Sequence, residues 1–562
     1  MSMQTQAPTE VHQERRQFFG AAKVISGITL LSRVTGLVRD AALARVFGDD
    51  LVMSAFFMAF KIPNLFRRLF GEGALSAAFV PVFSETLERS GRKEAESLLA
   101  NVMGLLALWM TVLCIAAELV LLVISALAPA EWDAHLILRF ASVMMPFMIS
   151  ICLLAVGSAA LNCVKHFAYP AAAPIILNLC NIAGTLWLSR FWNGKETRLM
   201  VVAASVLAAS VIQLVGVLWV MRAHGLPWRP RLRPVHPDVP RMLKMMLPML
   251  IPLGVLQINA LNDNIIAWIF SATEGSPDLV LGGWTIHKPL TEGVVVWINY
   301  GERLYQFPMG VLAIALATAV FPLFSRYAAR GDRVNLRGAV NQALRLAIFE
   351  GLPSGVGLWL LAEPVLMLWF VGRHSAYGPD AAAATAHIAQ MYGIGMWAFC
   401  AQQVLLRAFY AQKDTRTPLR VACTMMVLNF LLNLVFIWVP GVRHGAFGLS
   451  TSITAILNVI VLAFILRRRL GRLGLRSLSF SVARIAVATG VMAAAVWLCL
   501  AGIDRLHLAS HVDLFRVFGG LTAGAGAYLL TCRLLRAPEL GEILARPRPA
   551  VPAEPAAPVE GK

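Results

Sequence analysis

Residues 24–48 read VISGITLLSRVTGLVRDAALARVFG, and residues 53–73 read MSAFFMAFKIPNLFRRLFGEG. Both segments are long and apolar enough to cross a membrane, yet each of them carries arginines. An arginine at the depth of the bilayer centre costs roughly 3 kcal/mol on insertion scales, so such residues tend to face a wet interior and mark a pathway. The two segments therefore predict membrane helices that line a cationic cavity.

Three arginines in these segments, Arg33, Arg39 and Arg67, are the main candidates for the cavity wall. Arg33 and Arg39 are six residues apart, which places them about 120° apart around a helix and about 9 Å apart along it. Arg68 and Glu72 are one turn apart and can pair. The alternative for any single arginine is that it snorkels to the membrane surface or is neutralised by a neighbour. For the group of three we favour the cavity wall.

The composition is that of a helical membrane protein with many spans. Of the 562 residues, 58% are hydrophobic and only 14% are charged, and apolar runs of membrane-spanning length recur along nearly the whole chain. We expect an all-α fold with about fourteen transmembrane helices. The formal charge of +18 lies mainly in short segments between these runs, so it predicts contact with anionic lipids and no binding of nucleic acid.

Alternate loops differ sharply in basic content, and the positive-inside rule places the basic set, together with both termini, in the cytoplasm. The longest basic loop is rich in proline and reads as a linker between two six-helix lobes. A weak internal repeat supports this division, because residues 160–170 match residues 408–418 in the spacing of alanine, lysine and proline. The predicted parts are an N-terminal segment (1–22), an N-terminal lobe (23–221), a linker (222–242), a C-terminal lobe (243–466), a C-terminal helix pair (467–535) and a disordered tail (536–562).

A second charged cluster lies in the eighth predicted span, where residues 300–310 read YGERLYQFPMG. Arg303 and Gln306 are one turn apart on this helix, and Glu302 is adjacent to the arginine. In the internal repeat, this eighth span is the counterpart of the second span. Each lobe therefore offers basic residues to a common interface.

The chain lacks the motifs of nucleotide-driven or enzymatic chemistry. There is no GxxxxGK[ST] phosphate loop, no HExxH and no histidine–cysteine metal cluster, so we expect a transporter and not an enzyme. No cofactor is expected. The energy for resetting the cavity must then come from an ion gradient, for which sodium is the candidate ion, or from the membrane potential. One carboxylate, Asp263, and the neutral side chains of Asn429, Asn433 and Thr454 are a suitable set for a monovalent cation. The alternative is a cluster of hydrogen bonds that holds helices together.

Four segments carry a resemblance to a known family: 32–40 (SRVTGLVRD), 55–73 (AFFMAFKIPNLFRRLFGEG), 303–312 (RLYQFPMGVL) and 409–418 (FYAQKDTRTP). With them the chain closely resembles the MurJ (MviN) family of bacterial lipid II flippases, part of the multidrug/oligosaccharidyl-lipid/polysaccharide exporter superfamily. The resemblance implies a fourteen-helix inner-membrane protein with two six-helix lobes, a central cationic cavity and a C-terminal helix pair that forms a groove for the lipid tail. We expect the protein to be a monomer. The resemblance further implies alternating-access transport of undecaprenyl-linked peptidoglycan precursor to the periplasmic leaflet. The alternative substrates are another polyprenyl-linked saccharide or small drugs.

The resemblance also implies roles for particular residues. Arg33, Arg39, Arg67 and Arg303 resemble the arginines with which the family binds its substrate. The remaining charged and polar positions resemble gate or pairing residues, namely Asp40, Lys61, Arg68, Glu72, Glu302 and Gln306. Two positions depart from the family pattern by lacking a negative charge, Ser54 and Gln306, and residues 272–293 form a longer outer loop than the family leads us to expect.

The topology can be tested with single cysteines in a variant that lacks the eight native ones. We expect a cysteine at Ser90 or Gly331 to be shielded from an impermeant thiol reagent in intact cells, because both positions lie in basic loops. A cysteine at Gly441 should be labelled. The reverse labelling pattern would contradict the cytoplasmic placement of the termini.

Overall fold

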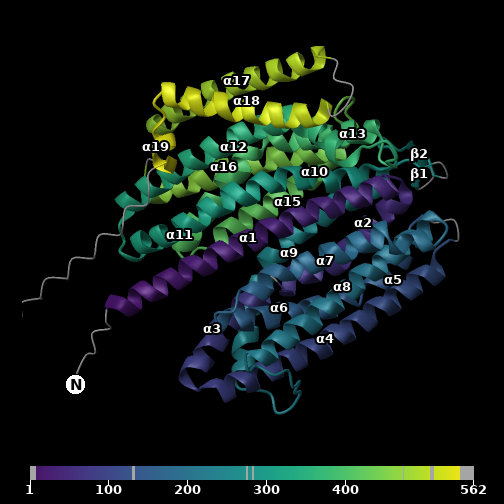
Figure 1. The fold of residues 1–562 in the computed structure, drawn as a ribbon, viewed down its shortest axis with the longest axis vertical. Helices are drawn as coiled ribbons and strands as arrows, with labels where there is room; N and C mark the ends of the chain where they lie inside the picture. The colour runs from purple at the N-terminus through teal and green to yellow at the C-terminus, as the bar shows by residue number, and fades with distance from the viewer. Residues whose placement is uncertain are drawn as a thin grey trace, which may run out of the picture. The chain divides into compact units, whose positions relative to one another are not determined.

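The computed structural model describes residues 8–71, 73–129, 133–273, 276–281, 284–471, 474–506 and 512–544, and nearly all of them are helical (Figure 1). Within these ranges, ten helices are long and apolar enough to cross a membrane, and α9 (Asp238–Phe270), bent by 42°, makes an eleventh. The all-α membrane fold is thereby confirmed. The number of fourteen spans stays a prediction, since the charged helix α1 (Pro8–Phe47) and the short helix α2 (Leu51–Phe66) fall outside this count.

The chain divides by packing into two compact units. Unit 1 comprises residues 1–306, 362–392 and 415–458. It contains α1, α2 and α9, most of α10 (Val294–Pro308), nearly all of α13 (Pro379–Ile394) and half of α16 (Ala446–Leu470). Its other helices and turns are η1 (Arg67–Gly71), α3 (Ala74–Arg89), α4 (Arg92–Leu127), α5 (His135–Met144), α6 (Phe147–Cys163), α7 (Ala168–Leu186), η2 (Leu188–Phe191), α8 (Lys195–Ala223), α15 (Arg416–Phe436) and η4 (Arg443–Gly445).

Unit 2 comprises residues 307–361, 393–414 and 459–562. Its core pairs are α11 (Ile314–Ala329) with α14 (Met396–Ala411), and α17 (Leu475–Arg505) with α18 (Val512–Leu534). It also contains η3 (Met309–Ala313), α19 (Pro538–Leu544) and the first part of α12 (Arg333–Phe370). This division cuts through α12 and α16 and follows packing alone, so the two six-helix lobes stay a prediction.

The charged stretch of α1 and the second predicted span have different packing partners in unit 1. α1 packs along α7, α2 packs against α5, and α3 packs against α9. The second span is broken into α2, the π-helical turn η1 and α3. Pro63 removes a backbone donor near the end of α2, and a π-helical turn also interrupts the regular ladder, so the chain can bend here.

The predicted linker is bound to the side of α4. The Asn101 side chain donates to the carbonyls of Arg231 and Pro234, both at 3.1 Å, and accepts from the backbone N–H of His236 at 3.0 Å. The backbone N–H of Arg231 donates to the Ala100 carbonyl at 3.1 Å. A Cβ at Gly104 would meet the Arg231 carbonyl oxygen at 2.6 Å, so this close approach of two backbones requires glycine.

The two segments of the internal repeat adopt the same turn. Lys165 and Lys413 both have positive φ, at 63° and 60°. In each segment the residue after the lysine donates its backbone N–H to the carbonyl of the residue five positions earlier. These bonds run from His166 to Leu161 and from Asp414 to Phe409. This is the hydrogen-bond pattern of a Schellman helix end, and its presence at both positions supports the repeat.

The long outer loop contains the one β-hairpin of the described ranges (Figure 1). β1 (Asp278–Leu281) pairs antiparallel with β2 (Trp284–His287), in a register that places Asp278 opposite His287. A backbone hydrogen bond from Ala272 to the Leu290 carbonyl, at 2.8 Å, closes the base of the loop. The loop was expected to be long, but its strands were not predicted.

Candidate functional site

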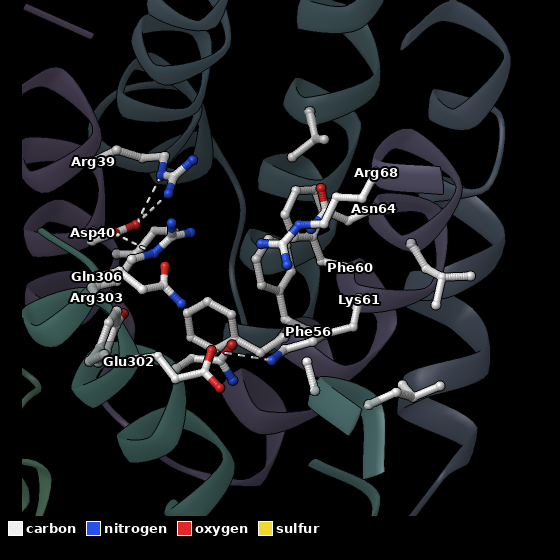
Figure 2. Close-up of a pocket in the computed structure, with 18 of the residues that line it drawn as sticks. Arg39, Asp40, Phe56, Phe60, Lys61, Asn64, Arg68, Glu302, Arg303 and Gln306 are labelled. Carbon is white, nitrogen blue, oxygen red and sulfur yellow. Dashed lines mark hydrogen bonds and ion pairs between the residues drawn. The ribbon is translucent and has the colours of Figure 1, made fainter. Parts of the chain in front are cut away.

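A polar cavity lies within unit 1, lined mainly by α1, α2, α9 and α10, with single residues of η1, α7 and α8. Its volume is about 90 Å³. This is well below the roughly 300–1,000 Å³ of typical ligand pockets, so the cavity is nearly closed in this conformation. Figure 2 shows charged side chains of α1, α2 and α10 directed into it.

Asp40 connects two cavity arginines that come from different helices. Arg39 donates to Asp40 Oδ1 from Nε at 3.0 Å and from Nη2 at 2.7 Å. Arg303 Nε, on α10, lies 3.4 Å from Asp40 Oδ2 (Figure 2). The Asp40 side chain is 5% exposed, whereas that of Arg303 is 47% exposed. One buried carboxylate thus links the N-terminal helix to α10, and its more exposed partner remains accessible from the cavity.

Arg39 is also held from its other side. Its Nη1 donates to Asn178 Oδ1 on α7 at 3.2 Å, and the Asn178 amide donates in turn to the carbonyl of Ser32 and the hydroxyl of Thr35, both at 3.1 Å. The guanidinium is therefore oriented by a carboxylate and an amide together. Such pre-orientation reduces the entropy lost when a ligand binds.

A second ion pair crosses the cavity between α2 and α10. Lys61 Nζ lies 3.9 Å from Glu302 Oε2, and the two side chains are 18% and 15% exposed (Figure 2). Both residues were expected to act in gating or charge pairing, but the pairing of one with the other was not predicted. The contact is long for a hydrogen bond, so it is chiefly an electrostatic attraction.

Arg68 and Arg67 occupy neighbouring positions but differ in their surroundings. Arg68 lines the cavity, and its Nη1 donates to Gln257 Oε1 of α9 at 3.3 Å. Arg67 Nε donates to Asn64 Oδ1 at 2.7 Å and does not line this cavity. The predicted partner of Arg68, Glu72, lies outside the described residues.

The remaining predicted residues fall into three groups. Gln306 lines the cavity with the charged residues. Arg33 is half-buried on α1 and does not line the cavity. Ser54 is buried, its hydroxyl has no hydrogen-bond partner, and it lines a separate outer cavity. The structure therefore brings Arg39 and Arg303 of the four candidate arginines to one cavity, while substrate contact by Arg33 and Arg67 stays a prediction.

The charge of the lining is positive. Four cationic side chains, Arg39, Lys61, Arg68 and Arg303, face two carboxylates, Asp40 and Glu302, which leaves a net charge of +2. Arginine donates bidentate hydrogen bonds to oxyanions, and these are stronger away from bulk water. The lining can therefore accept an anion whose oxygens replace the carboxylate of Asp40.

One wall of the cavity is aromatic. Phe56, Phe57 and Phe60 of α2 line it together with Tyr300 of α10. The rings of Phe57 and Tyr300 meet edge to face with centroids 5.4 Å apart. This wall contributes packing and shape beside the charged groups.

The candidate cation residues form a hydrogen-bonded cluster near the cavity. Asn433 Nδ2 donates to Asp263 Oδ1 at 2.6 Å, and the Asn429 amide, in the orientation that satisfies both its nitrogen and its oxygen, donates to the same carboxylate oxygen at 3.1 Å. Ser450 donates to Asn433 Oδ1, and the Thr454 hydroxyl donates to the Ser450 carbonyl at 2.9 Å. The four predicted residues are each no more than 6% exposed. They are thus brought to one region in which a single carboxylate accepts amide hydrogens, and a role in binding sodium stays a prediction.

Polar contacts join the flanking helices at both ends of unit 1. At one end, Arg241 Nη2 of α9 pairs with Glu85 Oε2 of α3 at 2.9 Å. At the other end, Trp297 Nε1 donates to Asp49 Oδ2 at 2.7 Å, and the backbone N–H of Leu51 donates to Glu292 Oε1 at 2.6 Å. Burial raises the pKa of the Asp49 carboxyl above its usual value, and the hydrogen bond from the indole opposes that rise.

Several cavity residues were not singled out as site candidates from the sequence. They are the neutral amides Asn64, Asn181, Gln257 and Asn299, with Asn178 behind Arg39. Their signal is weak but present, because an amide in an apolar helix must find a partner and commonly marks a helix contact or a cavity. Which of the two it marks depends on packing.

Comparison with known proteins agrees with this geometry. The family model described as "Lipid II flippase MurJ" matches residues 43–512. A protein of Rhizobium tropici, described as a probable lipid II flippase MurJ, is 31% identical over 474 residues, which cover 83% of this chain and 84% of the relative.

Solved structures show the same fold. A structure titled "Lipid II flippase MurJ, inward closed conformation" aligns with a TM-score of 0.70 at 24% identity, covering 91% of this chain and 98% of that one. An inward-facing multidrug resistance transporter of the MATE family aligns with a TM-score of 0.61 at 14% identity, covering 80% and 98%. Since the family model spans most of the sequence, the chain belongs to the lipid II flippase MurJ family of membrane transporters.

Proposed function

We propose that this protein moves lipid II, an undecaprenyl-linked peptidoglycan precursor, from the cytoplasmic to the periplasmic leaflet of the bacterial inner membrane. The observation that carries the proposal is the carboxylate of Asp40 held between Arg39 and Arg303. The substrate carries a diphosphate and an acidic peptide, so its oxyanions can take the place of Asp40. A small cationic drug would require acidic walls, which is opposite to the charge of this lining.

The transport cycle that fits this geometry is alternating access. In the present conformation the cavity of about 90 Å³ is far too small for a disaccharide-peptide head group. The head group therefore enters only after the helices around the cavity separate at one end. The contacts of Arg241 with Glu85 and of Trp297 with Asp49 are the pairs that have to break in turn.

We infer that binding of the substrate supplies free energy for the opening of the cavity. When the diphosphate binds to Arg39 and Arg303, it replaces the contacts that hold α1 to α10 through Asp40. The carboxylate is then left without its partners in apolar surroundings, which favours a rearrangement that hydrates it.

We propose that the protein works as a monomer, with both termini in the cytoplasm and its basic loops against anionic lipids.

Replacing Arg39 or Arg303 with alanine should abolish or strongly reduce flipping in reconstituted vesicles, at normal protein levels. Loss of a charged hydrogen bond costs about 1.5–3 kcal/mol, which corresponds to roughly a ten- to hundredfold fall in rate. Lysine should restore activity only in part, because it lacks the planar fork. Arg330→Ala is the matched control, since Arg330 is exposed at the end of α11 and lines neither the cavity nor the contacts that have to break. Full activity of both cavity variants would contradict the assignment.

The pair of Lys61 and Glu302 offers a charge-swap test. Lys61→Glu alone places two carboxylates side by side, and Glu302→Lys alone places two ammonium groups there, so each should slow flipping and lower the melting temperature. The double variant restores one charge of each sign and should recover melting temperature and part of the rate. A double variant no better than the worse single one would show that the contact contributes no coupling.

We propose a sodium gradient or the membrane potential as the source of energy for resetting the cavity. A potential contributes about 2.3 kcal/mol per charge moved across 100 mV. The cluster of Asp263, Asn429, Asn433 and Thr454 supplies one carboxylate and several neutral oxygens, which suits a monovalent cation once Asp263 exchanges its amide partner for the ion.

The sodium proposal is tested by Asp263→Asn. We expect this variant to lose the response of flipping to an imposed sodium gradient, while a potential imposed with potassium and valinomycin still acts. Asn341→Asp, which adds a carboxylate in unit 2, serves as a control of charge outside the cluster. A variant at Asp263 that responds to sodium as the parent does would remove the cluster from the coupling mechanism.

A further inference from the structure

A second cavity in unit 1 lies at the end of the helices opposite the basic loops, and the transport mechanism makes no use of it. Its volume is about 630 Å³, which is within the range of small-molecule sites. Its wall consists largely of apolar side chains, including Ile124 of α4, Ile137 and Leu138 of α5, and Ile269 of α9. Leu279 and Val280 of β1 also line it, so the hairpin borders the cavity.

The cavity adjoins a surface that faces lipid. The last turns of α4 carry large apolar side chains with high exposure, among them Leu122 at 66% and Leu127 at 81%. Two lining residues, Ile124 and Ile269, are themselves 38% and 42% exposed. In a spanning helix such side chains contact the hydrocarbon of the bilayer. Side chains of the kind that face lipid therefore border the cavity.

The hairpin has the composition of a segment that lies in the membrane interface. Residues 279–286 contain no charged side chain, and the charges resume at Asp278 and His287. Val280 is 69% exposed and Trp284 is 78% exposed. Tryptophan is enriched at the level of the lipid head groups, where its amphipathic ring is most stable. Contact with lipid head groups thereby explains the exposure of Trp284.

The polar groups of the cavity carry both signs of charge. Asp133 Oδ2 accepts from Thr273 Oγ1 at 3.1 Å, and Lys288 Nζ donates to Ser276 Oγ at 3.0 Å. Asp278 Oδ1 lies 2.9 Å from His287 Nδ1. Glu292 is already engaged by the backbone N–H of Leu51. Two carboxylates beside one ammonium group complement a head group that has an ammonium and a phosphate, and they disfavour a purely anionic one.

We propose that this outer cavity binds one acyl chain of a zwitterionic aminophospholipid from the adjacent leaflet, with the β1–β2 hairpin lying over it in the head-group region. The ammonium of the lipid faces Asp133 and Asp278, and its phosphate faces Lys288. The apolar wall takes the first part of the chain. This lipid is a resident ligand, distinct from the lipid that is transported.

The proposal is tested by native mass spectrometry of the full-length protein, transferred from lipid into detergent. The probes are dioleoyl phosphatidylethanolamine, dioleoyl phosphatidylglycerol and undecaprenyl phosphate at equal concentration. The parent protein should retain one molecule of the ethanolamine lipid in preference to the other two. Ile137→Trp, which fills the cavity, should reduce that retention about tenfold, equivalent to a loss of about 1.4 kcal/mol.

Leu122→Trp is the matched control, because it adds the same ring to an exposed position of α4 that does not line the cavity. Ile269→Trp fills the cavity from another helix and replaces Ile137→Trp if the latter does not elute as a monodisperse protein. Asp278→Lys should shift the preference toward phosphatidylglycerol. Equal retention by the parent and both cavity-filling variants overturns the proposal. Preferential retention of undecaprenyl phosphate also overturns it, and would assign the cavity to the transported lipid.

Discussion

The position of one carboxylate governs the arrangement of charges in this transporter. Asp40 is almost completely buried, and a charge in such surroundings is tolerated only with partners of opposite sign. It obtains them from the neighbouring Arg39 and from Arg303, which is distant in sequence. Each arginine in turn would be costly in an apolar helix without that carboxylate. The three residues therefore form a unit whose parts are stable only together, and a ligand that competes for one of them disturbs all three.

The second constraint is the small number of charges that balance each other across the cavity. Lys61 and Glu302 form an ion pair that joins α2 to α10, as Asp40 joins α1 to α10. The amides of Asn64, Asn178 and Gln257 then fix the directions of individual guanidinium groups. Because the lining still has an excess of two positive charges, it is prepared for an anion while remaining closed.

The sequence allowed the membrane fold and the charged residues of the cavity lining to be predicted, because charges in apolar helices are conspicuous and costly. Arg39, Arg303 and Lys61 stand out for this reason. The rotation of a helix is decided by its packing partners, so Arg33 and Arg67 could not be separated from the lining arginines by spacing alone. The hairpin was missed because residues 279–286 are too short and too apolar to be told from an irregular loop between two spans.

The linker between the predicted lobes is held on α4 through Asn101 and the backbone of Arg231. A connection of this length would ordinarily be a flexible linker, which lets the segments that it joins move independently. Here His236 is also hydrogen-bonded to Asn101, so only Pro237 separates the attached part of the linker from α9, which begins at Asp238. A displacement of α4 is therefore transmitted directly to the start of α9.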